Sequence, residues 1–165
     1  MKTFCLTSMI EVFLLLCTNG IQAQTVTPKL DQLKLMQTLV GNWQHVISND
    51  SIEIVECQQY GNAFVENVYL VVNGKKSFEV IRNYGFSPKE GKFNVFQLSP
   101  SGNYSTWVAS FTTEKKYYLN QVQNFDSDKV LLKGEIVFET PTNITATFFN
   151  LDGTTTGEFK WYKVK

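Results

Sequence analysis

The chain has 165 residues, of which 43% are hydrophobic and 14% aromatic, a composition typical of a globular protein with a sizeable core in one domain. Its 15 Lys and Arg balance its 15 Asp and Glu, so the net charge of zero argues against a nucleic-acid partner. With one His and three Cys, the chain offers few ways to build a zinc site or a pair of a nucleophile with His. We therefore expect neither a metal nor a cofactor.

The first 23 residues have the pattern of a secretory signal: a Lys near the start, a short apolar stretch, and Ala23 before the predicted cut. We predict a signal peptide over 1–23, a mature domain over 24–165, and export to the periplasm or the extracellular space. The apolar stretch is short for a transmembrane anchor, so we expect no integral membrane segment in the mature chain. A lipid anchor on Cys17 is the less favoured alternative, because Leu16 stands where such signals usually have a small residue.

Cleavage after Ala23 would leave Cys57 as the single cysteine of the mature chain. An exported protein with one cysteine has no internal disulfide, so packing must hold the fold. Cys57 has no base near it in the sequence, and we expect it to be a buried, unreactive side chain.

One segment of the mature chain has a helical pattern. Thr27 is a suitable cap, Pro28 suits the first turn and Gly41 ends the segment, and between them apolar residues recur at helical spacing, namely Leu30, Leu33, Met36 and Val40. We expect this short helix to pack across one end of a sheet.

After Gly41 the pattern alternates with a period of two, which indicates strands. Turn residues divide this region into ten predicted strands, at 41–48, 51–59, 63–72, 77–86, 92–98, 103–111, 116–124, 129–139, 143–151 and 157–164. Short links between successive strands require antiparallel pairing, and closure removes the exposed edges of such a meander. We predict an all-β, antiparallel up-and-down barrel of 8–10 strands, with a split sandwich as the alternative.

The junction of helix and first strand, Leu39-Val40-Gly41-Asn42-Trp43, resembles the start of calycins, the superfamily of the lipocalins. The turns Tyr84-Gly85-Phe86, Gly91-Lys92-Phe93 and Ser99-Pro100-Ser101-Gly102 are similar to those of secreted bacterial lipocalin-like proteins of unknown function. The resemblance implies that Gly41 and Trp43 are structural and that Lys163 covers the Trp43 ring at the closed end. Related barrels include fatty-acid-binding proteins and the haem-binding nitrobindin type. The latter uses a His late in the chain, and this chain has none after His45.

Alternation in 77–86 places Phe78, Val80, Arg82, Tyr84 and Phe86 on one face, and their apolar character predicts that this face points inward. An internal Arg82 needs a partner. Two interpretations stand: Arg82 anchors an anionic group of a ligand, or it forms an ion pair with Glu66 on the preceding strand.

Other polar and aromatic residues are candidates for the lining of an interior site. His45 shares a face with Trp43 and is predicted to point inward near the closed end, either as a ligand contact or as a hydrogen-bonded interior residue. Further candidates are Tyr84, Tyr104, Trp107, Gln121 and Gln123, a mixture typical of small-molecule sites. Because Tyr104 and Trp107 lie on opposite faces of 103–111, the pattern leaves open which face is inside.

The motifs of common catalytic sites are missing, since the sequence has no nucleophile elbow, phosphate-binding Gly-rich loop or His-Glu-x-x-His helix. We therefore expect an exported, lipocalin-like barrel that binds a small hydrophobic or amphipathic molecule and has no catalytic activity. The alternatives are a packed barrel that acts through its surface and, third, an enzyme of a kind that the motifs do not show.

Overall fold

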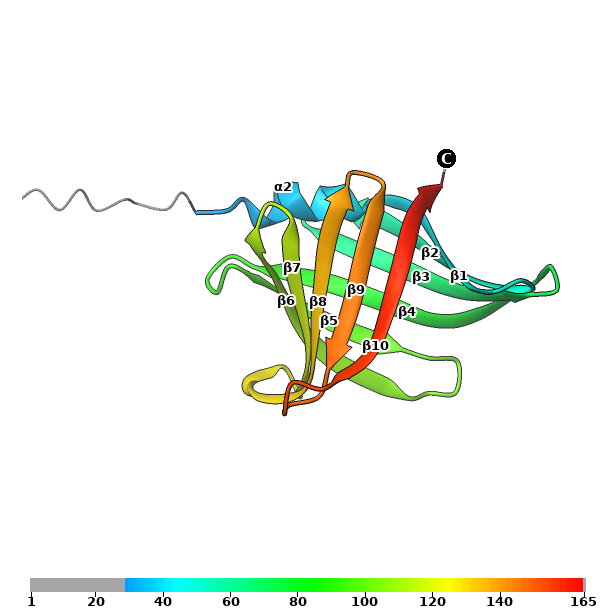
Figure 1. The fold of residues 1–165 in the computed structure, drawn as a ribbon. Helices are drawn as coiled ribbons and strands as arrows, with labels where there is room; N and C mark the ends of the chain where they lie inside the picture. The colour runs from blue at the N-terminus through cyan, green and yellow to red at the C-terminus, as the bar shows by residue number, and fades with distance from the viewer. Residues whose placement is uncertain (1–28, 165) are drawn as a thin grey trace, which may run out of the picture.

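The computed structural model of the protein describes residues 29–164, and its ten strands form one closed antiparallel barrel (Figure 1). Each strand pairs with its neighbours in sequence, and the first pairs with the last. The strands are β1 (Gly41–Ser48), β2 (Ser51–Tyr60), β3 (Ala63–Val72), β4 (Lys75–Ser87), β5 (Lys92–Leu98), β6 (Tyr104–Thr113), β7 (Lys116–Gln123), β8 (Asp126–Thr140), β9 (Asn143–Phe149) and β10 (Thr155–Val164). The predicted up-and-down barrel is confirmed, and the sandwich alternative is wrong. The predicted signal peptide lies outside the described residues.

The helix is shorter than predicted. Helix α2 spans Gln32–Met36 and continues as the 3₁₀ helix η1 over Gln37–Leu39. Its N-cap is Asp31, whose carboxylate accepts a hydrogen bond from the Lys34 N–H at 3.0 Å, and this cap starts the helix after Leu30. The expected cap and first-turn residues, Thr27 and Pro28, lie outside the described residues. Within residues 29–164, no helix is long and apolar enough to cross a membrane.

The helix covers one end of the barrel, which we call the closed end (Figure 1). The Gln32 side chain is fixed to β6, because its amide donates to the Phe111 carbonyl at 2.9 Å and accepts from the Phe111 N–H at 2.7 Å. The buried side chains beneath the helix include Met36, Leu39, Trp43, Cys57, Phe64, Phe93, Phe111, Tyr117 and Phe138. This packed layer fills the closed end without a disulfide, and Cys57 is 2% exposed within it.

Irregularities in the strand ladder change which residues point inward. Glu66 pairs with Arg82 and Val68 with Val80, but a register shift then pairs Tyr69 with Phe78. Phe78 therefore leaves the inward face, is 41% exposed and packs against Tyr69. The prediction that Phe78 lies inside is wrong, because a bulge breaks the alternation on which it rested.

The ladder that closes the barrel between β1 and β10 is short. These strands share three registered pairs, Asn42 to Gln44 with Val164 to Tyr162, whereas every other neighbouring pair of strands shares at least six. Beyond Gln44 the two strands diverge, with β10 turning away from β1 (Figure 1). We call this gap between residues 45–48 and 155–160 the seam.

Candidate functional site

A cavity of about 190 Å³ lies inside the barrel above the packed closed end. Apart from Tyr117 on β7, its polar side chains come from β2 to β5, and they are Glu53, Glu66, Arg82, Tyr84 and Gln97. Its aromatic wall comes from β6, β9 and β10, and it consists of Trp107, Phe148, Phe159 and Trp161. Edge-to-face contacts join Trp107 to Phe148 and Phe148 to Phe159, at ring-centre distances of 6.3 and 6.0 Å. The cavity thus has one polar side and one aromatic side.

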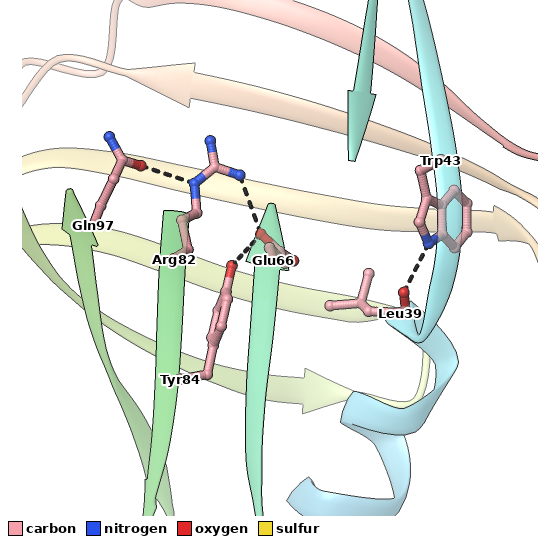
Figure 2. Close-up of polar contacts among 6 residues, drawn as sticks. All are labelled: Leu39, Trp43, Glu66, Arg82, Tyr84 and Gln97. Atoms are coloured by element: carbon pink, nitrogen blue, oxygen red, sulfur yellow. Dashed lines mark hydrogen bonds and ion pairs between the residues drawn. The ribbon is translucent and has the colours of Figure 1, made fainter. Parts of the chain in front are cut away.

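The polar side is organised around the Glu66 carboxylate (Figure 2). Arg82 Nη1 donates to it at 3.2 Å, and the Tyr84 hydroxyl donates to the same oxygen at 2.8 Å. Arg82 Nε donates to Gln97 Oε1 at 2.8 Å. Of the two interpretations of Arg82, the structure contains the ion pair, and Arg82 is also part of the cavity lining.

Burial determines the protonation of this cluster. It disfavours the charge of Arg82, but the interactions of Arg82 with Glu66, Tyr84 and Glu53 together outweigh burial, so the pKa of Arg82 is raised and the side chain stays charged. Burial, reinforced by the charge of Glu66, raises the pKa values of Tyr84 and Tyr117 well above 10. Both hydroxyls therefore remain protonated and able to donate hydrogen bonds.

The Tyr117 hydroxyl is buried and has no hydrogen-bond partner within the described part of the chain. Tyr117 lies on β7 and lines the cavity. Buried polar groups are nearly always hydrogen-bonded, so an unpartnered hydroxyl at a cavity wall marks a position where a ligand group or a water is expected.

Glu53 is the second carboxylate of the cavity and lies on β2, directly opposite His45 on β1. Burial raises its pKa above the ordinary glutamate value of 4.5, and the charges of Arg82 and His45 offset only part of that increase, while Glu79 adds to it. Within residues 29–164 the Glu53 carboxylate has neither an ion-pair nor a hydrogen-bond partner. Glu53 thus differs from Glu66, whose charge is compensated.

His45 lies at the seam and is half-buried. Its Nδ1 atom is 2.9 Å from the Lys160 carbonyl oxygen, and since a carbonyl can only accept, this ring nitrogen donates. The imidazole packs against Phe159 and Trp161, at ring-centre distances of 5.5 and 5.3 Å. Where the backbone ladder between β1 and β10 stops, the His45 side chain therefore bridges the two strands.

Gly41, Trp43 and Lys163 meet at the closed end. The Trp43 indole N–H donates to the Leu39 carbonyl at 2.8 Å (Figure 2), and Lys163 Nζ lies 5.2 Å from the Trp43 ring centre. Gly41 has a φ of 122°, and a Cβ there would lie 2.9 Å from the Lys163 side chain. Another residue at this position would be strained and would displace the lysine, so the three residues form a structural unit.

Of the remaining predicted site residues, some line the cavity and others lie outside its lining. Tyr84 and Trp107 line the cavity. Gln121 is the cross-strand partner of Trp107 but is not part of the lining. Tyr104 is 64% exposed and stacks on Phe96 outside the barrel, so the interior position expected for it is wrong. The inward face of β6 is the one that carries Trp107, and on the other face the buried Thr106 accepts a hydrogen bond from the Phe125 N–H in the segment after β7.

Sequence reasoning missed Glu53 and Gln97. Gln97 alternates with Phe93 and Val95, both fully buried, and this pattern could have placed it inside. Glu53 likewise alternates with Val55 and Cys57, both buried, so the same pattern in β2 could have placed it inside.

No protein-family model matches the sequence, and a search of curated proteins finds no significant match. Over residues 29–164, the closed ten-stranded antiparallel barrel with one short α-helix fits a calycin-like fold. Among residues 29–164, no three His, Cys, Asp or Glu side chains are grouped in a way that could hold a metal ion. The arrangement of the cavity can bind a molecule by hydrogen bonds, charge and aromatic contact.

Proposed function

We propose that this protein binds one small amphipathic molecule inside its barrel. The observation that carries the proposal is the cavity of about 190 Å³ with a polar and an aromatic side. Such a division is typical of small-molecule sites, where apolar walls supply affinity and a few polar groups fix orientation. The unpartnered Tyr117 hydroxyl supports the same proposal, since a bound molecule would supply its missing hydrogen bond.

The volume limits the size of the ligand. An apolar cavity of about 150 Å³ holds one benzene molecule, so this cavity accommodates a single ring with a short polar substituent. A long-chain fatty acid or a haem has several times as many non-hydrogen atoms as benzene, so most of it would lie outside this cavity. A cavity of this kind also favours the binding proposal over a fully packed barrel that acts only through its surface.

The proposal is tested by filling the cavity. Ala146 on β9 lines it and is 5% exposed, so Ala146→Leu should occupy part of the ligand volume. Its neighbour Thr147 is half-buried on the outer face, which makes Thr147→Leu the matched control. In a thermal-shift screen of small aromatic molecules, we expect ligands that stabilise the wild type and Thr147→Leu but not Ala146→Leu. Ligands that stabilise all three proteins equally, or none of them, would refute interior binding.

We further propose that the protein is exported and non-catalytic, as the sequence predicts. The export proposal rests on residues 1–23, and mass spectrometry of the protein from its native cell should give a mature chain that begins at Gln24. A chain that retains residues 1–23 would contradict it. The non-catalytic proposal rests on the cavity residues, whose hydrogen bonds position a ligand without offering a paired nucleophile and base.

A further inference from the structure

The charges that line the cavity are unbalanced. The lining contains two carboxylates and one guanidinium, which belong to Glu53, Glu66 and Arg82. Arg82 is bonded to Glu66 and to the Gln97 side chain, so its charge is already compensated. Glu53 keeps a carboxylate that no group within residues 29–164 pairs with. An anionic ligand would therefore meet an excess of negative charge, whereas a cationic one would balance it.

Glu53 lines the same cavity as the aromatic wall, and His45 connects the two. Glu53 faces His45 across the β1–β2 ladder, and the His45 ring contacts both Phe159 and Trp161 of that wall. The rest of the wall is formed by Trp107 and Phe148, whose rings contact each other. Aromatic faces attract cations through their ring quadrupoles, and the attraction is stronger in a water-poor site. A cavity lined by a carboxylate and several aromatic rings is a suitable environment for an ammonium group attached to an apolar skeleton.

We infer that the ligand is a small aromatic amine, bound with its ammonium group at Glu53 and its ring against Trp107, Phe148, Phe159 and Trp161. This inference rests on the proposed function and names the chemical class of the ligand. It differs from the sequence-based hypothesis that Arg82 anchors an anion. The buried Tyr117 hydroxyl lines the same cavity without a partner among residues 29–164, so a polar group of the ligand, like a water, would supply its missing hydrogen bond.

The test uses three probes that share one ring and differ in charge: 2-phenylethylamine, 2-phenylethanol and phenylacetate. Their affinities for the mature protein are measured by calorimetric titration at neutral pH and low ionic strength. We expect the amine to bind at least tenfold more tightly than the alcohol, and the acid to bind most weakly. Glu53→Gln should remove the tenfold advantage of the amine and leave the affinity for the alcohol unchanged.

The matched control is Glu158→Gln, a carboxylate on the exposed face of β10, which should preserve the preference for the amine. Thermal unfolding of each variant checks that the fold is intact, and Glu53→Gln keeps the size of the side chain. Equal affinities for the three probes, or tightest binding of the acid with loss in Arg82→Gln, would overturn the inference. If none of the three binds while another molecule from the screen does, the inference fails and the proposed function stands. If nothing binds in either experiment, both fail.

Discussion

At the scale of single residues, the cavity depends on the Glu66 carboxylate, whose side chain is 8% exposed and accepts from both Arg82 and Tyr84. Removing one partner of a buried ion pair leaves an uncompensated charge. We expect Glu66→Leu to lower the free energy of unfolding by about 3 kcal/mol, at the low end of the usual range because Arg82 is 26% exposed. Urea denaturation measures the change.

A double variant distinguishes the lost charge partner from lost packing. Glu66→Leu combined with Arg82→Met should return to within about 1 kcal/mol of the wild type, the remainder reflecting the Tyr84 hydroxyl without its acceptor. Glu56→Leu is the control, because its pair with Lys76 is solvent-exposed and should contribute less than about 1 kcal/mol. A double variant as unstable as Glu66→Leu alone would refute the compensating role assigned to the ion pair.

The raised pKa of Glu53 should make the free energy of unfolding depend on pH, and replacing Glu53 should remove that dependence. Its pKa is higher in the folded protein than in the unfolded chain, because burial disfavours its charge. The folded state therefore binds the proton more tightly, and the free energy of unfolding falls as the pH rises from about 4.5 through the folded pKa. Glu53→Gln removes this decline, so we expect the variant to gain stability relative to the wild type as the pH rises over that window.

Subtracting the two curves removes the contributions of other groups. Asp152 and Glu135 have lowered pKa values in the folded protein. The first cause is a side-chain hydrogen bond, from Thr154 to Asp152 and from Tyr118 to Glu135. The stability that each carboxylate contributes to the protein is lost as the pH falls. These effects are common to both proteins and cancel. A difference between wild type and Glu53→Gln that does not change between pH 4 and pH 8, measured by urea denaturation, would show that Glu53 titrates normally.

At the scale of elements, the seam between β1 and β10 is the weakest part of the barrel, because only three registered pairs join these strands. Unpaired backbone groups exchange hydrogen faster than those in a continuous ladder. In residue-resolved hydrogen exchange, we expect the seam-side amides of 45–48 and 155–160 to exchange faster than those of 63–68 in β3, which are paired on both sides. Equal protection in the two regions would mean that the seam is closed in solution.

Elements also show what the sequence could predict. All ten strands follow from alternation and turn residues, since polar turns and apolar strands are local properties of the chain. The register within a hairpin is less local. The tight turn at Asn49-Asp50 pairs Ser48 with Ser51, and an unbroken ladder would then pair His45 with Ile54. The bulge after Val46 pairs His45 with Glu53 instead, so it decides which β1 residue lies opposite this carboxylate, whereas the inward position of Glu53 follows from its alternation with Val55 and Cys57.

Arg82 and Glu66 illustrate the opposite case. Their pairing across β3 and β4 follows from alternation in both strands, and it precedes the irregularity that moves Phe78 outward. Inward positions were therefore predictable where ladders are regular, and they were not predictable where a bulge shifts the faces of a strand, as at Phe78. Bulges depend on how the whole sheet closes, and a single strand carries little sign of them.

At the scale of the whole molecule, the barrel combines a filled end and a hollow one. The helix, Trp43 and the aromatic layer beneath them close one end, so the cavity has a firm floor. Above that floor the polar strands β2 to β5 face the aromatic strands β6, β9 and β10. The cavity has a polar side and an aromatic side because different strands of the chain supply them.

The central claim, that this interior holds a ligand, is tested most directly by native mass spectrometry of protein purified from its own cell without denaturation. We predict a retained small molecule on the wild-type chain and its loss in Ala146→Leu, the variant that fills the cavity. A bound molecule that persists equally in both proteins would place the ligand elsewhere. A wild-type mass equal to that of the polypeptide alone would contradict the claim.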